Sequence, residues 1–201
     1  YKLMERKIQL ILGTFALFRG IAFAISKGGA ISKFPEWFGF LGQSYLFGYI
    51  PAQLFLFVIL SIIFWLILSK TSLGRYIYAI GNNVKTTTFS GVSVGKVQIY
   101  IYTLTGFLVG VAGTIHTSRI FTARGNAGFE LELACIAAVV LGGARITGGS
   151  GTIVGTILGV LILNYLKDGF LFYGLRSDWG LVIIGVVLIT GVFINEFFRK
   201  K

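Results

Sequence analysis

Few side chains in this sequence are of the types that carry out chemistry. The only histidine, His116, has no second histidine with which to share a metal ion, and the only cysteine, Cys135, sits in an apolar run without a ligating neighbour at a useful spacing. The carboxylates fall in predicted loops or at the ends of apolar runs. The phosphate-binding pattern Gly-x-x-x-x-Gly-Lys-Ser/Thr does not occur. The sequence therefore predicts no catalytic residue, no metal site and no cofactor, and any energy for work must come from a partner.

One charged side chain, Arg19, is predicted well inside an apolar run. A charge at that depth in a bilayer costs about 2.5–3.5 kcal/mol on insertion scales unless it is paired or reaches the interface. Arg19 is therefore expected to face protein or water. It could line a solute path or anchor a broken helix at Gly20, or it could be bonded to a backbone carbonyl or a carboxylate for structure alone, which is the interpretation we favour.

The composition is that of a membrane protein. Hydrophobic residues make up 55% of the chain and charged residues 12%, against about 25% charged residues in soluble domains. The mean hydropathy is +0.85. The net charge of +11 comes from basic residues at the ends of apolar runs rather than from a clustered arm or stripe, so a nucleic-acid partner is not expected. The lipid bilayer is the expected surrounding.

Six apolar runs are candidate spans, at about residues 8–26, 52–68, 97–116, 130–143, 151–166 and 179–197. The fourth and fifth are short, and residues 142–151 between them are too rich in glycine to continue a helix. These two runs could be half-helices or a re-entrant pair. The predicted fold class is an all-α membrane protein with about six transmembrane or re-entrant helices, forming one domain over residues 1–201.

The charge distribution predicts that both termini are cytoplasmic. With that orientation, 11 of the 18 Lys and Arg residues face the cytoplasm with only two acids, whereas six face outside with five acids. Cationic loops are retained on the cytoplasmic side during insertion. Residues 69–96, which carry Lys and Arg but no acid, and the tail Arg199-Lys200-Lys201 are therefore expected to be cytoplasmic.

Glycines recur at four-residue spacing in two runs, as Gly151-Gly155-Gly159 and Gly106-Gly110. This spacing places them on one helical face, where the backbones of two helices can approach closely. Both faces are expected to pack helix on helix.

Residues 69–96 also carry a motif, Gly74-Arg75-Tyr76, Ala79-Ile80-Gly81, Asn83 and Ser90-Gly91-Val92, that resembles the coupling loop of bacterial ABC-importer permeases of the ribose-type sugar family. The resemblance extends to Arg19-Gly20, to Phe38-Gly39-Phe40-Leu41-Gly42, to the run 136–143 and to Gly148-Gly149-Ser150-Gly151-Thr152. It implies that the loop docks on an ATPase, with Gly81, Asn83, Ser90, Gly91 and Val92 as the coupling residues. Gly81 and Gly91 are expected to bracket a short helix that they terminate.

The resemblance implies the permease subunit of an ABC transporter that imports a monosaccharide or sugar-like solute across the bacterial cytoplasmic (inner) membrane. Its implied partners are a cytoplasmic ATP-binding subunit, an extracytoplasmic solute-binding protein and a second permease subunit in a homo- or heterodimer. The aromatic segment 34–49 is expected at the membrane interface, or with Glu36 against the solute-binding protein. Branched-chain amino acids or nucleosides are alternative solutes, and a truncated remnant without transport activity is a third interpretation.

Differences from the family in length and in sequence affect these expectations. The chain corresponds to the C-terminal two thirds of such a permease and is expected to lack its first few helices. Where many relatives read Glu-Leu-Asp, this chain reads Glu132-Leu133-Ala134, so one carboxylate is replaced and Glu132 remains. Arg19 and Glu132 are the candidate residues of a translocation path.

Overall fold

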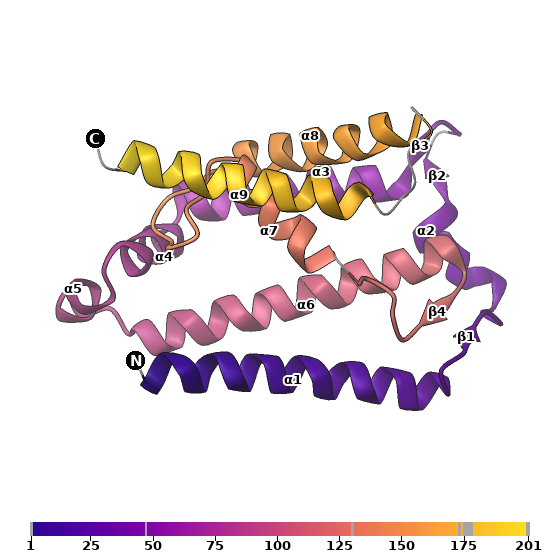
Figure 1. The fold of residues 1–201 in the computed structure, drawn as a ribbon, viewed down its shortest axis with the longest axis horizontal. Helices are drawn as coiled ribbons and strands as arrows, with labels where there is room; N and C mark the ends of the chain where they lie inside the picture. Colours follow the sequence, from indigo (N-terminus) through magenta and orange to yellow (C-terminus); the bar gives the residue numbers. More distant parts are fainter. Residues whose placement is uncertain (1, 47, 130, 173, 175–178, 200–201) are drawn as a thin grey trace. The chain divides into compact units, whose positions relative to one another are not determined.

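The computed structural model describes residues 2–46, 48–129, 131–172, 174 and 179–199 (Figure 1). Expectations that involve Phe47, Glu130, Arg176, Asp178, Lys200 and Lys201, including the end of the cationic tail, lie outside these residues. The five longest helices are α1 (Lys2–Ser26), α3 (Ala52–Lys70), α6 (Val94–Ile120), α8 (Ile153–Phe172) and α9 (Trp179–Arg199). The shorter ones are the 3-10 helix η1 (Glu36–Gly39), α2 (Phe40–Gln43), α4 (Ser72–Asn82), α5 (Val84–Phe89) and α7 (Leu131–Leu141).

Within the described residues, four helices are long and apolar enough to cross a membrane, over Gln9–Ser26, Ala52–Lys70, Val94–Ile120 and Ile153–Phe170. Two shorter apolar stretches are Leu131–Leu141 and Val182–Gly191. Large apolar side chains on these helices are exposed, for example 66% for Phe18, 68% for Phe107 and 74% for Ile189. Such surfaces are compatible with lipid rather than water. A helical membrane protein is therefore confirmed, whereas the number of spans stays a prediction.

The glycine-rich break between the fourth and fifth runs is confirmed, but the length expected of the fifth run is wrong. Helix α7 ends at Leu141 and α8 begins at Ile153. Helix α7 is short, with 11 residues, as expected. Helix α8 has 20 residues and continues past Lys167 and Asp168, because charged side chains interrupt an apolar pattern without interrupting the hydrogen bonds of a helical backbone.

Four strands of two residues each, β1 (Ala30–Ile31), β2 (Tyr45–Leu46), β3 (Ile50–Pro51) and β4 (Ala123–Arg124), were not expected from the sequence. β1 pairs antiparallel with β4, and β2 pairs antiparallel with β3. Strands this short leave no alternating pattern in the sequence. They join loops and leave the helical class unchanged.

The chain divides into two compact units, one of Tyr1–Phe55 with Leu108–Phe129 and one of Leu56–Phe107 with Glu130–Lys201. In the first unit, η1 and α2 lie against the end of α6. The Ser118 hydroxyl donates to the Phe38 carbonyl, and the Gln43 amide donates to the Arg119 carbonyl at 3.2 Å. The rings of Phe34 and Phe38 stack with their centroids 4.8 Å apart. Whether the two units form the single domain expected from the sequence stays a prediction.

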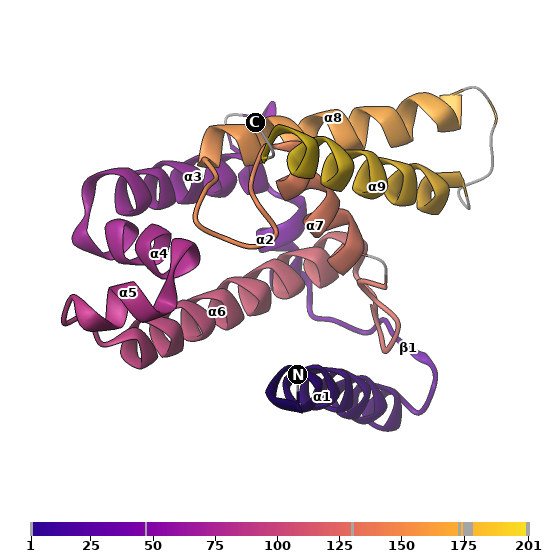
Figure 2. The same ribbon diagram turned by 60° about the vertical axis from the view of Figure 1, so that its left-hand side comes forward.

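The second unit is built around α7, which packs against both α8 and α9 (Figure 2). Its core consists of Ala134, Ala137, Ala138, Leu163 and Ile184. A β-carbon added at Gly159 would overlap the Ala138 carbonyl, and one added at Gly155 would overlap the Gly142 carbonyl. Helix packing through glycine is thereby confirmed for α8. Around Gly106 and Gly110 of α6, nothing among the described residues lies within 4 Å of an added β-carbon, so the packing expected of that pair is not seen.

Candidate functional site

The segment expected to couple the protein to an ATPase folds as two consecutive short helices, α4 and α5, rather than as an irregular loop. Each begins with a polar cap that satisfies a free amide of the first helical turn. The Gly74 amide donates to the Thr71 hydroxyl at 3.4 Å, and the Thr86 amide donates to the Asn83 side-chain oxygen at 3.1 Å. Asn83, one of the predicted coupling residues, therefore starts α5.

Three other predicted coupling residues, Ser90, Gly91 and Val92, end that helix. Gly91 has a φ of 82°, in the left-handed region that glycine adopts without strain. The Gly91 amide donates to the Thr88 carbonyl at 3.0 Å, and the Val92 amide donates to the Thr87 carbonyl at 3.4 Å. These paired bonds form a Schellman motif. The expectation that Gly91 terminates a short helix is confirmed.

The same expectation is wrong for Gly81. Gly81 lies inside α4, which continues through Asn82, so it terminates nothing. A β-carbon at Gly81 would overlap the backbone nitrogen of Gly149, in the glycine-rich connection between α7 and α8. Gly81 is thus explained by a close approach of two backbones that are far apart in sequence.

An open pocket of about 640 Å³ lies between α4, α5 and the beginning of α6. It contains four of the five predicted coupling residues, with Gly81 as the exception. Its lining is mostly polar or small and carries one cation: Arg75, Tyr76, Ala79, Asn82, Asn83, Thr86, Thr87, Ser90, Gly91, Val92, Ser93 and Val97. A segment of another protein could enter this pocket, because it is open and, apart from Arg75, its polar lining groups are uncharged.

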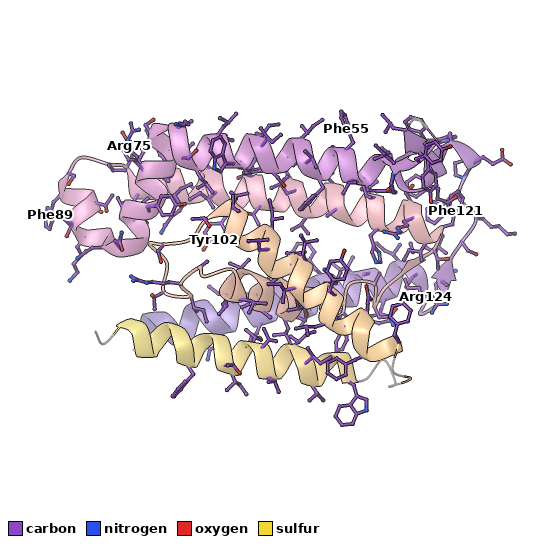
Figure 3. All side chains as sticks on the ribbon, turned by 90° about the horizontal axis from the view of Figure 1, so that it is seen from above. Phe55, Arg75, Phe89, Tyr102, Phe121 and Arg124 are labelled. Atoms are coloured by element: carbon purple, nitrogen blue, oxygen red, sulfur yellow. The ribbon has the colours of Figure 1, made fainter. Side chains whose placement is uncertain are left out.

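Phe89, at the tip of α5, was not singled out by sequence reasoning. Its side chain is 90% exposed and projects from the end of the helix pair (Figure 3). Val84 on the same helix is 48% exposed. Both residues belong to a segment whose other side chains are polar or cationic. The exposed ring of Phe89 is available for contact with another protein.

Arg19 and Glu132, the two residues assigned to a translocation path, belong to different units. The Arg19 guanidinium lies 4.4 Å from the ring centroid of Phe15 and 4.9 Å from that of Phe129. Among the described residues, these cation–π contacts supply aromatic partners for the charge, where we expected a carbonyl or a carboxylate. Glu132 is exposed in the first turn of α7. A role for either residue in translocation stays a prediction.

A second set of residues was also missed: Tyr78 and Asn82, on the face of α4 that carries Gly81. The Tyr78 hydroxyl donates to the Gly151 carbonyl at 2.8 Å. The Asn82 amide donates to the Gly149 carbonyl at 3.5 Å. Residues 78, 81 and 82 have the spacing of one helical face, which was a signal available in the sequence.

Comparisons with known proteins show the family of the chain. Residues 1–192 match the family described as branched-chain amino acid transport system / permease component. The chain belongs to this permease family. It is 41% identical to the ribose import permease protein RbsC of Bacillus subtilis (strain 168) over 192 residues, which cover 94% of the chain and 58% of that protein.

Two other permeases are similar to the chain over most of its length. Identity is 35% to the ribose import permease protein RbsC of Escherichia coli (strain K12), over 94% of the chain and 61% of that protein. It is 36% to the autoinducer 2 import system permease protein LsrD of Photorhabdus temperata, over 92% of the chain and 57% of that protein. The chain thus spans about three fifths of the length of these permeases. No solved structure gives a significant match.

Proposed function

We propose that the chain forms the transmembrane part of an ABC-importer permease subunit, which moves a monosaccharide or sugar-like solute into the cell while a separate subunit hydrolyses ATP. The observation that carries this proposal is the similarity to ribose import permeases over 94% of the chain. The lack of a phosphate-binding motif in the sequence agrees with ATP being bound by a partner. The family description names branched-chain amino acids, but the named relatives favour a sugar over an amino acid or nucleoside.

The proposed orientation places α4, α5 and both termini in the cytoplasm, in a multi-pass protein of the bacterial inner membrane. The support is the asymmetry of Lys and Arg along the chain. With this orientation, the η1–α2 region of the first unit faces outside. Its exposed rings, including Trp37 at 74% and Phe40 at 74%, are then available to the membrane interface or to a solute-binding protein.

In this proposal α4 and α5 dock on the ATPase, and a second permease subunit completes the assembly. Phe89 is the proposed anchor, because covering a phenylalanine that is exposed to water stabilises a complex by about 1.5–3 kcal/mol. Arg75 lines the pocket, Lys85 lies on α5, and residues 69–96 carry no acid. Closure of the ATPase pair would then displace α4 and α5 and expose the solute path to alternate sides. Arg19 and Glu132 are proposed residues of that path.

The test is uptake by the complete permease, reconstituted into lipid vesicles with its ATPase and solute-binding protein. We expect ATP-dependent accumulation of a radiolabelled pentose such as ribose, with little uptake of leucine or uridine. Preferential uptake of leucine or uridine would overturn the sugar assignment. Failure to accumulate any of these solutes, with a correctly assembled complex, would favour the remnant interpretation.

Docking is tested separately with Phe89→Ala. We expect this variant to weaken ATPase binding by about tenfold or more, as removal of a central aromatic anchor does in protein interfaces. Phe107→Ala is the matched control, because Phe107 is 68% exposed but lies within an apolar span. Equal ATPase affinity of the Phe89→Ala variant and the unmodified permease would show that α5 is not the docking element.

A further inference from the structure

One helix of the coupling segment is in direct contact with the connection between two helices of the core. Helix α4 approaches residues 142–151 so closely that a β-carbon at Gly81 would lie 2.8 Å from the Gly149 α-carbon. The reverse also holds, because a β-carbon at Gly148 would lie 3.2 Å from the Gly81 α-carbon. The two segments therefore meet backbone to backbone. A contact of this kind has no flexible side chain that could absorb a displacement.

Hydrogen bonds hold the same two segments together on either side of that contact. The Tyr78 hydroxyl donates to the Gly151 carbonyl at 2.8 Å, and the Asn82 amide donates to the Gly149 carbonyl at 3.5 Å. The backbone contact resists movement of α4 toward the connection. The two hydrogen bonds resist movement away from it.

The glycine-rich connection is itself closely tied to α7 and α8. Its own backbone bonds include the Arg145 amide to the Ser150 carbonyl at 3.1 Å and the Gly148 amide to the Arg145 carbonyl at 3.0 Å. At its end, the Gly155 amide donates to the Thr152 hydroxyl at 3.0 Å, which caps α8. The connection is therefore a bonded turn rather than a loose loop, and it moves with the helices on which it ends.

Those helices form the most closely packed part of the second unit. The exposed fractions are 0% for Ala137 and 3% for Ala138 of α7 and 2% for Leu163 of α8, and Ile184 of α9, at 2%, belongs to the same core. Close-packed interiors transmit displacement rather than deform. A push on residues 142–151 should consequently reach α7 and α8 as a movement of the pair.

We propose that Tyr78, Gly81 and Asn82 form a joint with Gly149 and Gly151, through which movement of the coupling segment reaches α7 and α8. The proposal rests on the proposed function, because it assumes that an ATPase moves α4 and α5. Gly81 sets how closely the two backbones approach, and the Tyr78 and Asn82 hydrogen bonds keep them together. These residues act through α7 and α8, so they are positioning residues rather than solute-binding ones.

The first experiment replaces Gly81 in the complete importer and separates assembly from coupling. In complexes that purify with the ATPase bound, we expect Gly81→Ala to reduce solute-stimulated hydrolysis and uptake about tenfold or more, because the added methyl group separates the two backbones. Gly95→Ala is the control, since nothing lies within 4 Å of a β-carbon at Gly95 of α6. If an assembled Gly81→Ala importer showed the same solute-stimulated ATP hydrolysis as the unmodified one, the proposed joint would be wrong.

A milder variant tests the joint if Gly81→Ala does not assemble. Tyr78→Phe removes only a hydroxyl, so we expect stimulation to fall about fivefold, the factor that one ordinary hydrogen bond represents. Tyr102→Phe is the control, because the Tyr102 side chain is 76% exposed. Equal stimulation in the two tyrosine variants would overturn the joint. Failure of the unmodified permease to bind an ATPase would instead overturn the proposed function, and the coupling role with it.

The movement itself is tested by the distance between spin labels at Ser72→Cys and Ile146→Cys, with Cys135 replaced by serine. Residues 72 and 146 are exposed positions on α4 and on the connection. If the joint holds, this distance stays constant between the nucleotide-free and ATP-bound importer. In Tyr78→Phe the distance distribution should broaden. A changed distance in the otherwise unmodified importer would show that α4 and the connection move independently.

Discussion

Helices α5 and α7 end in the same way but stand in different surroundings. After α7, Gly143 has a φ of 85°, and after α5, Gly91 has a φ of 82°. The Gly143 amide donates to the Val140 carbonyl at 2.9 Å and the Ala144 amide to the Val139 carbonyl at 3.1 Å, which repeats the paired bonds seen after α5. In α7, four residues are buried, whereas in α5 only Thr87 is. An identical local motif thus ends a core helix and an almost fully exposed one.

This difference in burial indicates which interactions stabilise each helix. A helix of six residues, such as α5, is too short to be stable by itself in water, because helix nucleation is costly. Its shape therefore depends on its caps, Asn83 at the start and Gly91 at the end. Helix α7 is held by packing against α8 and α9, so its terminal glycine is a smaller part of its stability. A substitution that disturbs packing should therefore destabilise α7 more, and one that removes a cap should destabilise α5 more.

The largest effect is expected from Gly159→Leu, which acts on the packing of α7. The new side chain would begin where the Ala138 carbonyl now lies, so α7 and α8 must separate. Overfilling a packed interior costs about 1–3 kcal/mol, and we expect a value at the upper end because backbone atoms are displaced. Thermal unfolding of the purified permease in detergent measures the change.

The control for this prediction lies on the same helix. Nothing comes within 4 Å of a β-carbon at Gly169 of α8, so Gly169→Leu should leave the midpoint of thermal unfolding nearly unchanged. If both leucine variants lowered it equally, the close contact between α7 and α8 would not be important for stability.

An intermediate effect is expected from Gly143→Ala and Gly91→Ala, which form a matched pair. Both positions have positive φ, and at both an added β-carbon has no neighbour within 4 Å, so the substitution acts through backbone strain alone. The cost is about 1–2 kcal/mol at each site. At Gly143 we expect part of it to appear in thermal unfolding of the whole permease. At Gly91 we expect only faster amide exchange in residues 84–89, because α5 can unfold locally.

Asparagine adopts positive φ more readily than alanine does, and it provides the control for this pair. Gly143→Asn and Gly91→Asn should each be less destabilised than the corresponding alanine variant. An equally large fall in thermal stability for Gly91→Ala and Gly143→Ala would mean that α5 is as strongly tied to the core as α7 is.

The sequence predicted local features of the site better than long-range ones. The break at residues 142–151 was predictable because a cluster of glycines disfavours helix wherever it occurs. The short helix before Gly91 was predictable for a similarly local reason. The prediction that Gly81 ends a helix was wrong. A sequence does not distinguish a glycine that is required for a positive φ from one that is required for a close approach of two backbones. The partner of Gly81, Gly149, is 68 residues away, and no periodicity relates the two.

The smallest effect is expected from Asn83→Ala, which removes the cap at the start of α5. The Thr86 amide loses the side-chain oxygen that accepts its proton at 3.1 Å, and loss of such a cap costs about 1 kcal/mol. Since α5 contributes little buried surface, the cost should appear as roughly fivefold faster amide exchange within α5, with the thermal midpoint unchanged. Asn83→Asp keeps the acceptor and should exchange at nearly the original rate. Unaltered exchange in Asn83→Ala would mean that contacts other than the cap hold α5, and the contrast with α7 would then be wrong.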